Sequence, residues 1–145
     1  MSPLQRARRD ERGAGYLAAF IVLMSTLLVG GVAALADAGR IGAAQRRSST
    51  IAFEAARAGA QEVRVGGGDG GIALDTSVAR SRAASTANEL AAASPARLEH
   101  VGVVGDEVVV VVNYPVRRWF PGLGTVVVRE EGRARLAIGV VEEGG

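Results

Sequence analysis

The sequence predicts an α+β fold: one long N-terminal helix and a short second helix, followed by a small, mostly antiparallel sheet of three or four strands that packs on the long helix. Three observations support this prediction. An uncharged segment, 13–36, runs without a proline into a segment of helical periodicity. A glycine-rich break then separates it from a second helical stretch. After Pro95, valine-rich runs typical of strands replace the helical spacing.

The first element is the apolar segment 13–36, which contains no acidic, basic or amide side chain. A helix of this length is roughly 36 Å long. The hydrocarbon core of a bilayer is about 30 Å thick, so such a helix can cross it with some tilt. We therefore expect a transmembrane segment.

The tail that precedes this segment, residues 1–12, carries four arginines against two acids. A short arginine-rich tail before an apolar span favours a cytoplasmic N-terminus. We expect a single-pass protein of the cell membrane whose tail, or leader, is cytoplasmic and whose residues 37–145 form an extracytoplasmic domain.

The helix is expected to continue as an amphipathic half over 37–63. Its apolar and small residues recur at steps of three and four, which places them on one face. They are Ile41, Ala44, Ser48, Ile51, Ala55 and Ala58. Because most of these side chains are small, the element that packs on them has to approach closely.

A second helix is expected at 76–93, after a glycine-rich connector at 64–75. Asp75 or Thr76 can cap its first turn, and Ser94-Pro95 stops it. Its buried face is predicted to consist of Ala79, Ala83, Ala87 and Leu90.

The sheet is expected within 96–141. Segments 97–104 and 107–114 form a strand pair joined at Gly105-Asp106, and TVVVREE and RARLAIGVV form a second pair after a loop at 115–124. The five-valine run at 108–112 has no polar face, so it predicts a central strand with both faces covered.

Composition argues against most enzyme classes. The chain has no cysteine, no lysine and a single histidine, His100, and only 4% of its residues are aromatic. These absences disfavour thiolate or multi-histidine metal sites, Schiff-base chemistry and base-stacking platforms. Adjacent acids, as in Asp106-Glu107 and Glu130-Glu131, point to opposite faces of a strand and cannot easily share a substrate. We expect no enzymatic activity, cofactor, metal, nucleic acid or small-molecule substrate.

A family resemblance rests on three short motifs: Glu11-Arg12-Gly13, the Asp-Ala-Gly-Arg of 37–40, and the AFEAARAGA of 52–60. With the layout of the whole chain, they resemble the TadE/TadG-like minor pilins, or pseudopilins, of tight-adherence (Flp-type) pilus systems. The resemblance implies a pilin-like fold and a part in pilus assembly or a related bacterial secretion apparatus. The implied partners are other pilin-like subunits and pilus assembly platform proteins.

The resemblance also implies a processing site. Cleavage by a prepilin peptidase would fall between Gly13 and Ala14. The chain departs from the family in one respect, since family members usually carry a glutamate early in the span. Ala18 and Ala19 occupy the corresponding positions here.

A second interpretation treats the apolar segment as a secretory signal. Ala34-Leu35-Ala36 before Asp37 fits the small-residue site of a signal peptidase, which would cut between Ala36 and Asp37. The alternative function is then a secreted or membrane-anchored extracytoplasmic binding module unrelated to pili.

Two groups of residues are candidates for contacts. Small residues in the span permit close helix packing in a membrane, and these are Gly30, Gly31, Ala33 and Ala34. The run Arg117-Arg118-Trp119-Phe120 can dock a partner protein or touch anionic headgroups; alternatively, its aromatic side chains fold back over the core.

Overall fold

The computed structural model describes residues 3–65, 72–119 and 122–136, with side chains at 15–62, 73–119 and 122–136. Its elements follow one another in the predicted order, and the α+β fold class is confirmed. They are helix α1 (Pro3–Ala60), strands β1 (Val63–Val65) and β2 (Ile72–Leu74), helix α2 (Thr76–Ala91), and strands β3 (Arg97–Val104), β4 (Glu107–Arg117) and β5 (Thr125–Arg135).

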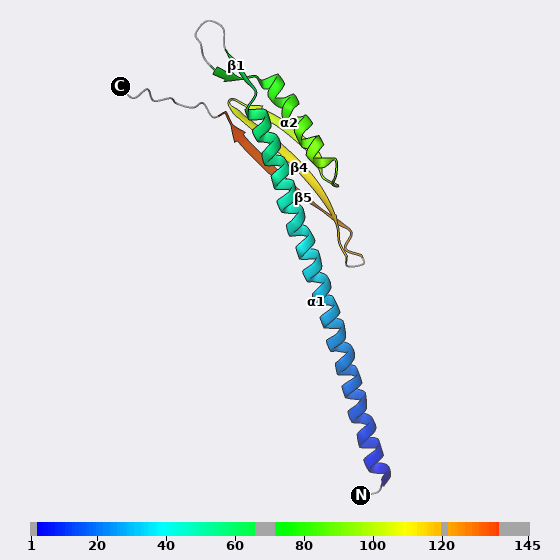
Figure 1. Cartoon of the computed structure of the whole chain (residues 1–145). Helices are drawn as coiled ribbons and strands as arrows, with labels where there is room; N and C mark the ends of the chain where they lie inside the picture. Colours follow the sequence, from blue (N-terminus) through cyan, green and yellow to red (C-terminus); the bar gives the residue numbers. More distant parts are fainter. Residues whose placement is uncertain (1–2, 66–71, 120–121, 137–145) are drawn as a thin grey trace, which may run out of the picture.

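Helix α1 is much longer than the rest of the fold (Figure 1). Its C-terminal half lies along the sheet, whereas its N-terminal half projects beyond the sheet and α2 (Figure 1). Both helices cover the same face of the sheet, with α1 over β4 and β5 and α2 over β3 and β4. The fold is therefore a body built around one half of a helix whose other half stands free.

The main sheet has three antiparallel strands in the order β3-β4-β5. Strand β4 is central, as the valine run predicted. The turn between β3 and β4 is at Gly105-Asp106, where Gly105 has a φ of 61° that favours glycine.

Two predictions about the sheet were wrong. The second strand pair does not form, because β5 runs straight through Glu130-Glu131 and pairs with β4 from Arg117↔Thr125 to Glu107↔Arg135. The predicted residues after Leu136 lie outside the described residues. Strand β4 also continues to Arg117, through a proline that was expected to begin a loop.

Pro115 is tolerated in β4 because of its position relative to β3. Pairing between β3 and β4 ends at Asn113, so β4 has only β5 as a neighbour at Pro115. A proline has no N–H to donate to a neighbouring strand, and this loss is tolerated where one side of the strand has no neighbour.

The segment predicted as a glycine-rich connector contains a short hairpin. Strands β1 and β2 pair antiparallel, with Val63 opposite Leu74 and Val65 opposite Ile72. The intervening glycine run, 66–71, lies outside the described residues. Since this pairing begins at Val63, α1 ends at Ala60, slightly before the predicted boundary.

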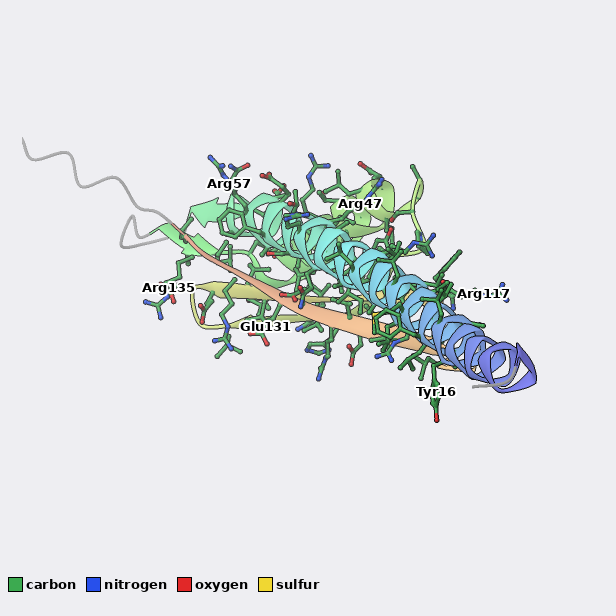
Figure 2. The ribbon with its side chains drawn as sticks, turned by 90° about the horizontal axis from the view of Figure 1, so that it is seen from below. Tyr16, Arg47, Arg57, Arg117, Glu131 and Arg135 are labelled. Carbon is green, nitrogen blue, oxygen red and sulfur yellow. The ribbon has the colours of Figure 1, made fainter. Side chains whose placement is uncertain are left out.

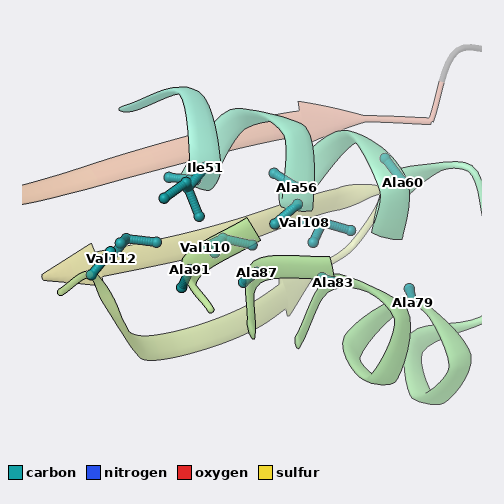
Figure 3. Close-up of a cluster of buried hydrophobic side chains, with 13 residues drawn as sticks. Ile51, Ala56, Ala60, Ala79, Ala83, Ala87, Ala91, Val108, Val110 and Val112 are labelled. Carbon is teal, nitrogen blue, oxygen red and sulfur yellow. The ribbon is translucent and has the colours of Figure 1, made fainter. Parts of the chain in front are cut away.

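The core lies between α1, α2 and β4 (Figure 3). Helix α2 contributes alanines only, α1 mainly alanines, and β4 contributes valines. Small side chains on both helices allow the close helix contact that the α1 sequence predicted. The principal buried residues are Ile51, Ala52, Ala55, Ala56, Ala60, Ala79, Ala83, Ala87, Ala91, Val108, Val110 and Val112.

The predicted capping of α2 is confirmed, and one residue of its predicted face is wrong. The Asp75 side chain accepts hydrogen bonds from the backbone N–H groups of Ser77 and Val78. Ala91, not Leu90, is the fourth buried position, and Leu90 is 42% exposed. Each step of four residues moves the contact line about 40° around the helix, so by the last turn of α2 this line has reached Ala91 and Leu90 lies beside it.

Two glycines set how closely the elements approach. A Cβ on Gly59 would lie 2.8 Å from the carbonyl oxygen of Ala79 and 3.1 Å from Val108. A Cβ on Gly132, in β5, would overlap the backbone of Ala52 in α1. Helix α1 thus rests directly on the backbone of β5 at Gly132.

The other face of the sheet carries cross-strand ion pairs. Arg129 of β5 reaches over β4 to Glu99 of β3, with 2.9 Å between Nε and Oε2. Glu107 of β4 pairs with Arg133 and Arg135 of β5 at 3.9 and 4.0 Å. Helices therefore cover one face of β4, and long charged side chains lie across the other.

Candidate functional site

The projecting half of α1 exposes a continuous apolar surface. Its large side chains point outward on all sides of the helix, including Tyr16 (Figure 2). Soluble proteins rarely expose so large an apolar surface. By length and composition, α1 is the one helix of the described chain that could cross a membrane. The exposed residues are Tyr16, Leu17, Phe20, Ile21, Val22, Leu23, Met24, Leu27, Leu28, Val29, Val32 and Leu35.

The loop after β4 is bonded to α1 at Asp37. The backbone N–H of Trp119, in the loop after β4, donates a hydrogen bond to Asp37 Oδ1 at 2.7 Å. Asp37 is only 8% exposed, and Ala33, one turn earlier on the same face, is also buried. The loop between β4 and β5 is thereby fixed to the helix where the uncharged segment 13–36 ends.

This loop exposes apolar side chains. The N–H of Arg118 donates to the carbonyl of Gly124 at 3.2 Å, which closes the base of the loop. Gly122 and Gly124 have φ values of 92° and 66°, a conformation that glycine adopts without strain. Trp119 is 59% and Leu123 52% exposed, so the Trp119 indole is not folded into the core.

A hollow beside the loop is lined by three arginines, and we refer to it as the arginine hollow. Arg118 Nε is buried and has no hydrogen-bond partner among the described residues. The described lining contains no acidic residue. The lining residues are Arg40, Arg117, Arg118, Trp119, Gly122, Gly124 and Thr125.

The hollow is at one end of the sheet. Arg117 projects outward at this end, and Arg135 at the other (Figure 2). Two elements far apart in sequence build it, since Arg40 comes from α1 and Arg117 from the end of β4. A second hollow shares Arg40 and Arg117 and has Pro115, Val116 and Ala44 in its wall, with other residues. Positive charge therefore gathers where the sheet ends and the bare helix begins.

The predicted contact residues fall into separate places. Arg117, Arg118 and Trp119 lie together at the hollow, whereas Phe120 is outside the described residues. Of the small residues in the span, Ala33 is buried inside the chain. A Cβ on Gly30 or Gly31 would have no atom within 4 Å, and Ala34 is exposed, so these positions stay open.

Both predicted processing sites lie within α1. Gly13 and Ala14 are helical, and their side chains are not described. Ala36 and Asp37 are also helical, with no break in α1 between them. Cleavage after Ala36 would require local unwinding, and the Asp37 carboxylate is held by Trp119.

Sequence reasoning missed the part that Asp37 and Arg40 play. The sequence analysis placed both residues in the motif 37–40 at the membrane boundary, but it predicted no contact for either of them in the fold. Their only sequence signal is their position, because they are the first two charges after the apolar segment. Residues that follow a span directly are the ones that a neighbouring loop can meet at the end of the body.

Other polar residues considered in the sequence analysis lie apart from one another. His100 is exposed on β3, and Glu131 pairs with Arg133 on the outer face of the sheet. Glu130 is on the helix side of β5, so the two adjacent glutamates point apart. Among the described residues, no three His, Cys, Asp or Glu side chains are grouped to hold a metal ion.

In comparisons with known proteins, no family model, curated protein or solved structure matches the chain. The resemblance to minor pilins therefore rests on the sequence motifs alone.

Proposed function

We propose that this protein is a non-enzymatic, single-pass membrane protein that acts as a minor pilin-like component of a Tad/Flp-type pilus or a related secretion apparatus. The apolar half of α1 anchors it and packs against other helices. The body acts through protein contacts outside the cytoplasm, and the N-terminal tail stays in the cytoplasm.

One observation carries the proposal: the core is built on one half of a continuous helix whose apolar other half is bare (Figure 1). A signal sequence needs no structural continuity with the mature domain. Here, Ala33 and Asp37 are packed in the body although they lie within or next to the apolar segment. This continuity favours a retained anchor over the secreted binding module.

The open small residues of the span support helix packing in the membrane. Gly30, Gly31 and Ala34 leave room for a second helix to approach α1 closely. Membrane helices associate through such close packing, because in lipid there is no hydrophobic driving force that brings apolar side chains together.

Mass spectrometry of the mature protein, recovered from membranes, tests the processing. A chain that begins at Ala14 supports pilin-type processing, and one that retains the residues before Gly13 supports an unprocessed anchor. A chain that begins at Asp37 overturns the anchored role in favour of the secreted module.

Photo-crosslinking in cells tests the partners. A photoreactive amino acid at Leu28, in the bare helix, should capture pilin-like subunits or polytopic platform proteins. The matched control is Val104 in the turn region of β3, because both side chains are 72% exposed. Capture of only unrelated membrane proteins from Leu28 contradicts the pilus role.

A further inference from the structure

The arginine hollow lies at the level where the uncharged part of α1 ends. Trp119 is bonded to Asp37, the first charge after the apolar segment, and Arg40 is about 4.5 Å further along the helix axis. The headgroup region of a bilayer occupies about 5–7 Å on each side of its hydrocarbon core. A helix that spans the membrane with residues 13–36 therefore places the hollow among the headgroups.

The three arginines of the hollow outnumber the nearby Asp37 carboxylate, which is bonded to the backbone N–H of Trp119. Arg40, Arg117 and Arg118 form no ion pair with any described residue. By contrast, four arginines of α2 and β5 do pair with glutamates: Arg82, Arg129, Arg133 and Arg135. Arg118 Nε is in addition buried without a hydrogen-bond partner. Such a group is stabilised by an anionic acceptor, and the planar guanidinium fork suits a phosphate.

The loop also has the side chains of a membrane interface. The exposed Trp119 and Leu123 lie next to the arginines. Tryptophan is enriched at the headgroup level, where the apolar ring meets lipid and the indole N–H meets water. Exposed apolar groups beside unpaired cations are suited to a bilayer surface, where apolar acyl chains lie next to anionic headgroups.

We propose that the arginine hollow binds the phosphate group of an anionic phospholipid in the leaflet on the body's side of the membrane. The three arginines supply the charge, and Trp119 rests at the headgroup boundary. The contact fixes the angle between the body and the membrane, because the Asp37 bond ties this loop to the helix. The inference rests on the membrane-anchoring part of the proposed function and not on the pilus role.

Lipid is favoured over an acidic protein as the occupant because of position. The anchor holds the hollow permanently among lipid phosphates, so binding is effectively intramolecular and occurs at high local concentration. A soluble acidic partner would have to compete with those phosphates for the same three side chains.

The test uses Trp119, the chain's single tryptophan, as a reporter. The full chain is reconstituted into vesicles of mixed phosphatidylglycerol and phosphatidylcholine, in which one lipid or the other is brominated. Brominated phosphatidylglycerol should quench Trp119 more strongly than brominated phosphatidylcholine at equal mole fraction. The preference should weaken as salt is added.

Substitution of arginines in the hollow should then show which side chains cause the preference for phosphatidylglycerol. Arg40→Gln and Arg118→Gln should each reduce the preference for phosphatidylglycerol about fivefold, the usual effect of one basic residue at an anionic surface. Arg40 is exposed on α1, so its replacement should leave the fold intact, as circular dichroism can verify. The control is Arg80→Gln, an exposed arginine of α2 that does not line the hollow, and it should change nothing.

Carbonate extraction of the same vesicles separates the two proposals. Release of the chain shows that the anchor itself is absent. A retained chain whose Trp119 is quenched equally by both lipids overturns the lipid site alone. In that second case, a shift of Trp119 emission in lipid-free micelles on addition of inorganic phosphate or polyglutamate, but not of chloride at matched ionic strength, assigns the hollow to a soluble anion or an acidic protein.

Discussion

The Asp37 carboxylate accepts a hydrogen bond from the backbone N–H of Trp119, 82 residues away in the chain. This one contact joins the middle of α1 to the loop between β4 and β5. It fixes that loop to the helix where the uncharged segment 13–36 ends. Its removal should release the loop while the core between α1, α2 and β4 stays in place.

Replacement of Asp37 by alanine should raise amide hydrogen exchange at Trp119 at least about tenfold, because a hydrogen bond to a charged acceptor contributes about 1.5–3 kcal/mol. Asp37→Asn keeps an acceptor and should have a smaller effect. Exchange is measured on the full chain in detergent micelles. Asp106→Ala, in the exposed β3–β4 turn, is the control, and equal protection of Trp119 in Asp37→Ala would show that the bond does not hold the loop.

Gly132→Ala should destabilise the body by about 3 kcal/mol, because the new methyl group overlaps the backbone of Ala52 and forces α1 away from β5. Urea unfolding of the full chain in micelles measures the loss. Gly39→Ala is the matched control. It adds the same group to α1 where no atom lies within 4 Å, and it should stabilise the helix by about 0.5–1 kcal/mol. Equal stabilities of the two variants would contradict the close contact.

The helices could be predicted from sequence because their signals are local. Asp75 caps α2, Pro95 follows it, and the alanine spacing points to its buried face. The choice of Leu90 as the fourth buried residue failed because steps of three and of four both fit one helix face, and the structure takes the step of four from Ala87 to Ala91.

The sheet was harder to predict because its limits depend on partners far away in sequence. Glu130-Glu131-Gly132 has the composition of a turn, yet these residues pair with Val112, Val111 and Val110. Gly132 is required by the approach of Ala52, and no local pattern records that contact. The candidate site also depends on distant partners, because Arg40 and Arg117 line one hollow only when β4 extends past Pro115.

Val110→Ala should cost about 2–3 kcal/mol of unfolding free energy, through lost apolar burial and the cavity left between β4 and the helices. Val127→Ala removes the same atoms from a side chain that is 57% exposed, so it should cost less than about 1 kcal/mol. The comparison uses the same denaturant titration. If Val127→Ala lost as much unfolding free energy as Val110→Ala, the Val127 side chain would have to be covered by a further surface.

The ion pair between Glu99 and Arg129 should contribute little to stability even though its atoms are 2.9 Å apart. Its side chains are 36% and 65% exposed, so water and salt screen the attraction. A double-mutant cycle of Glu99→Gln and Arg129→Gln should give a coupling energy below about 1 kcal/mol that falls further as salt is added. The pair is then chiefly a cover for the outer face of β4. A salt-insensitive coupling of several kcal/mol would instead indicate that a further surface excludes water from this face.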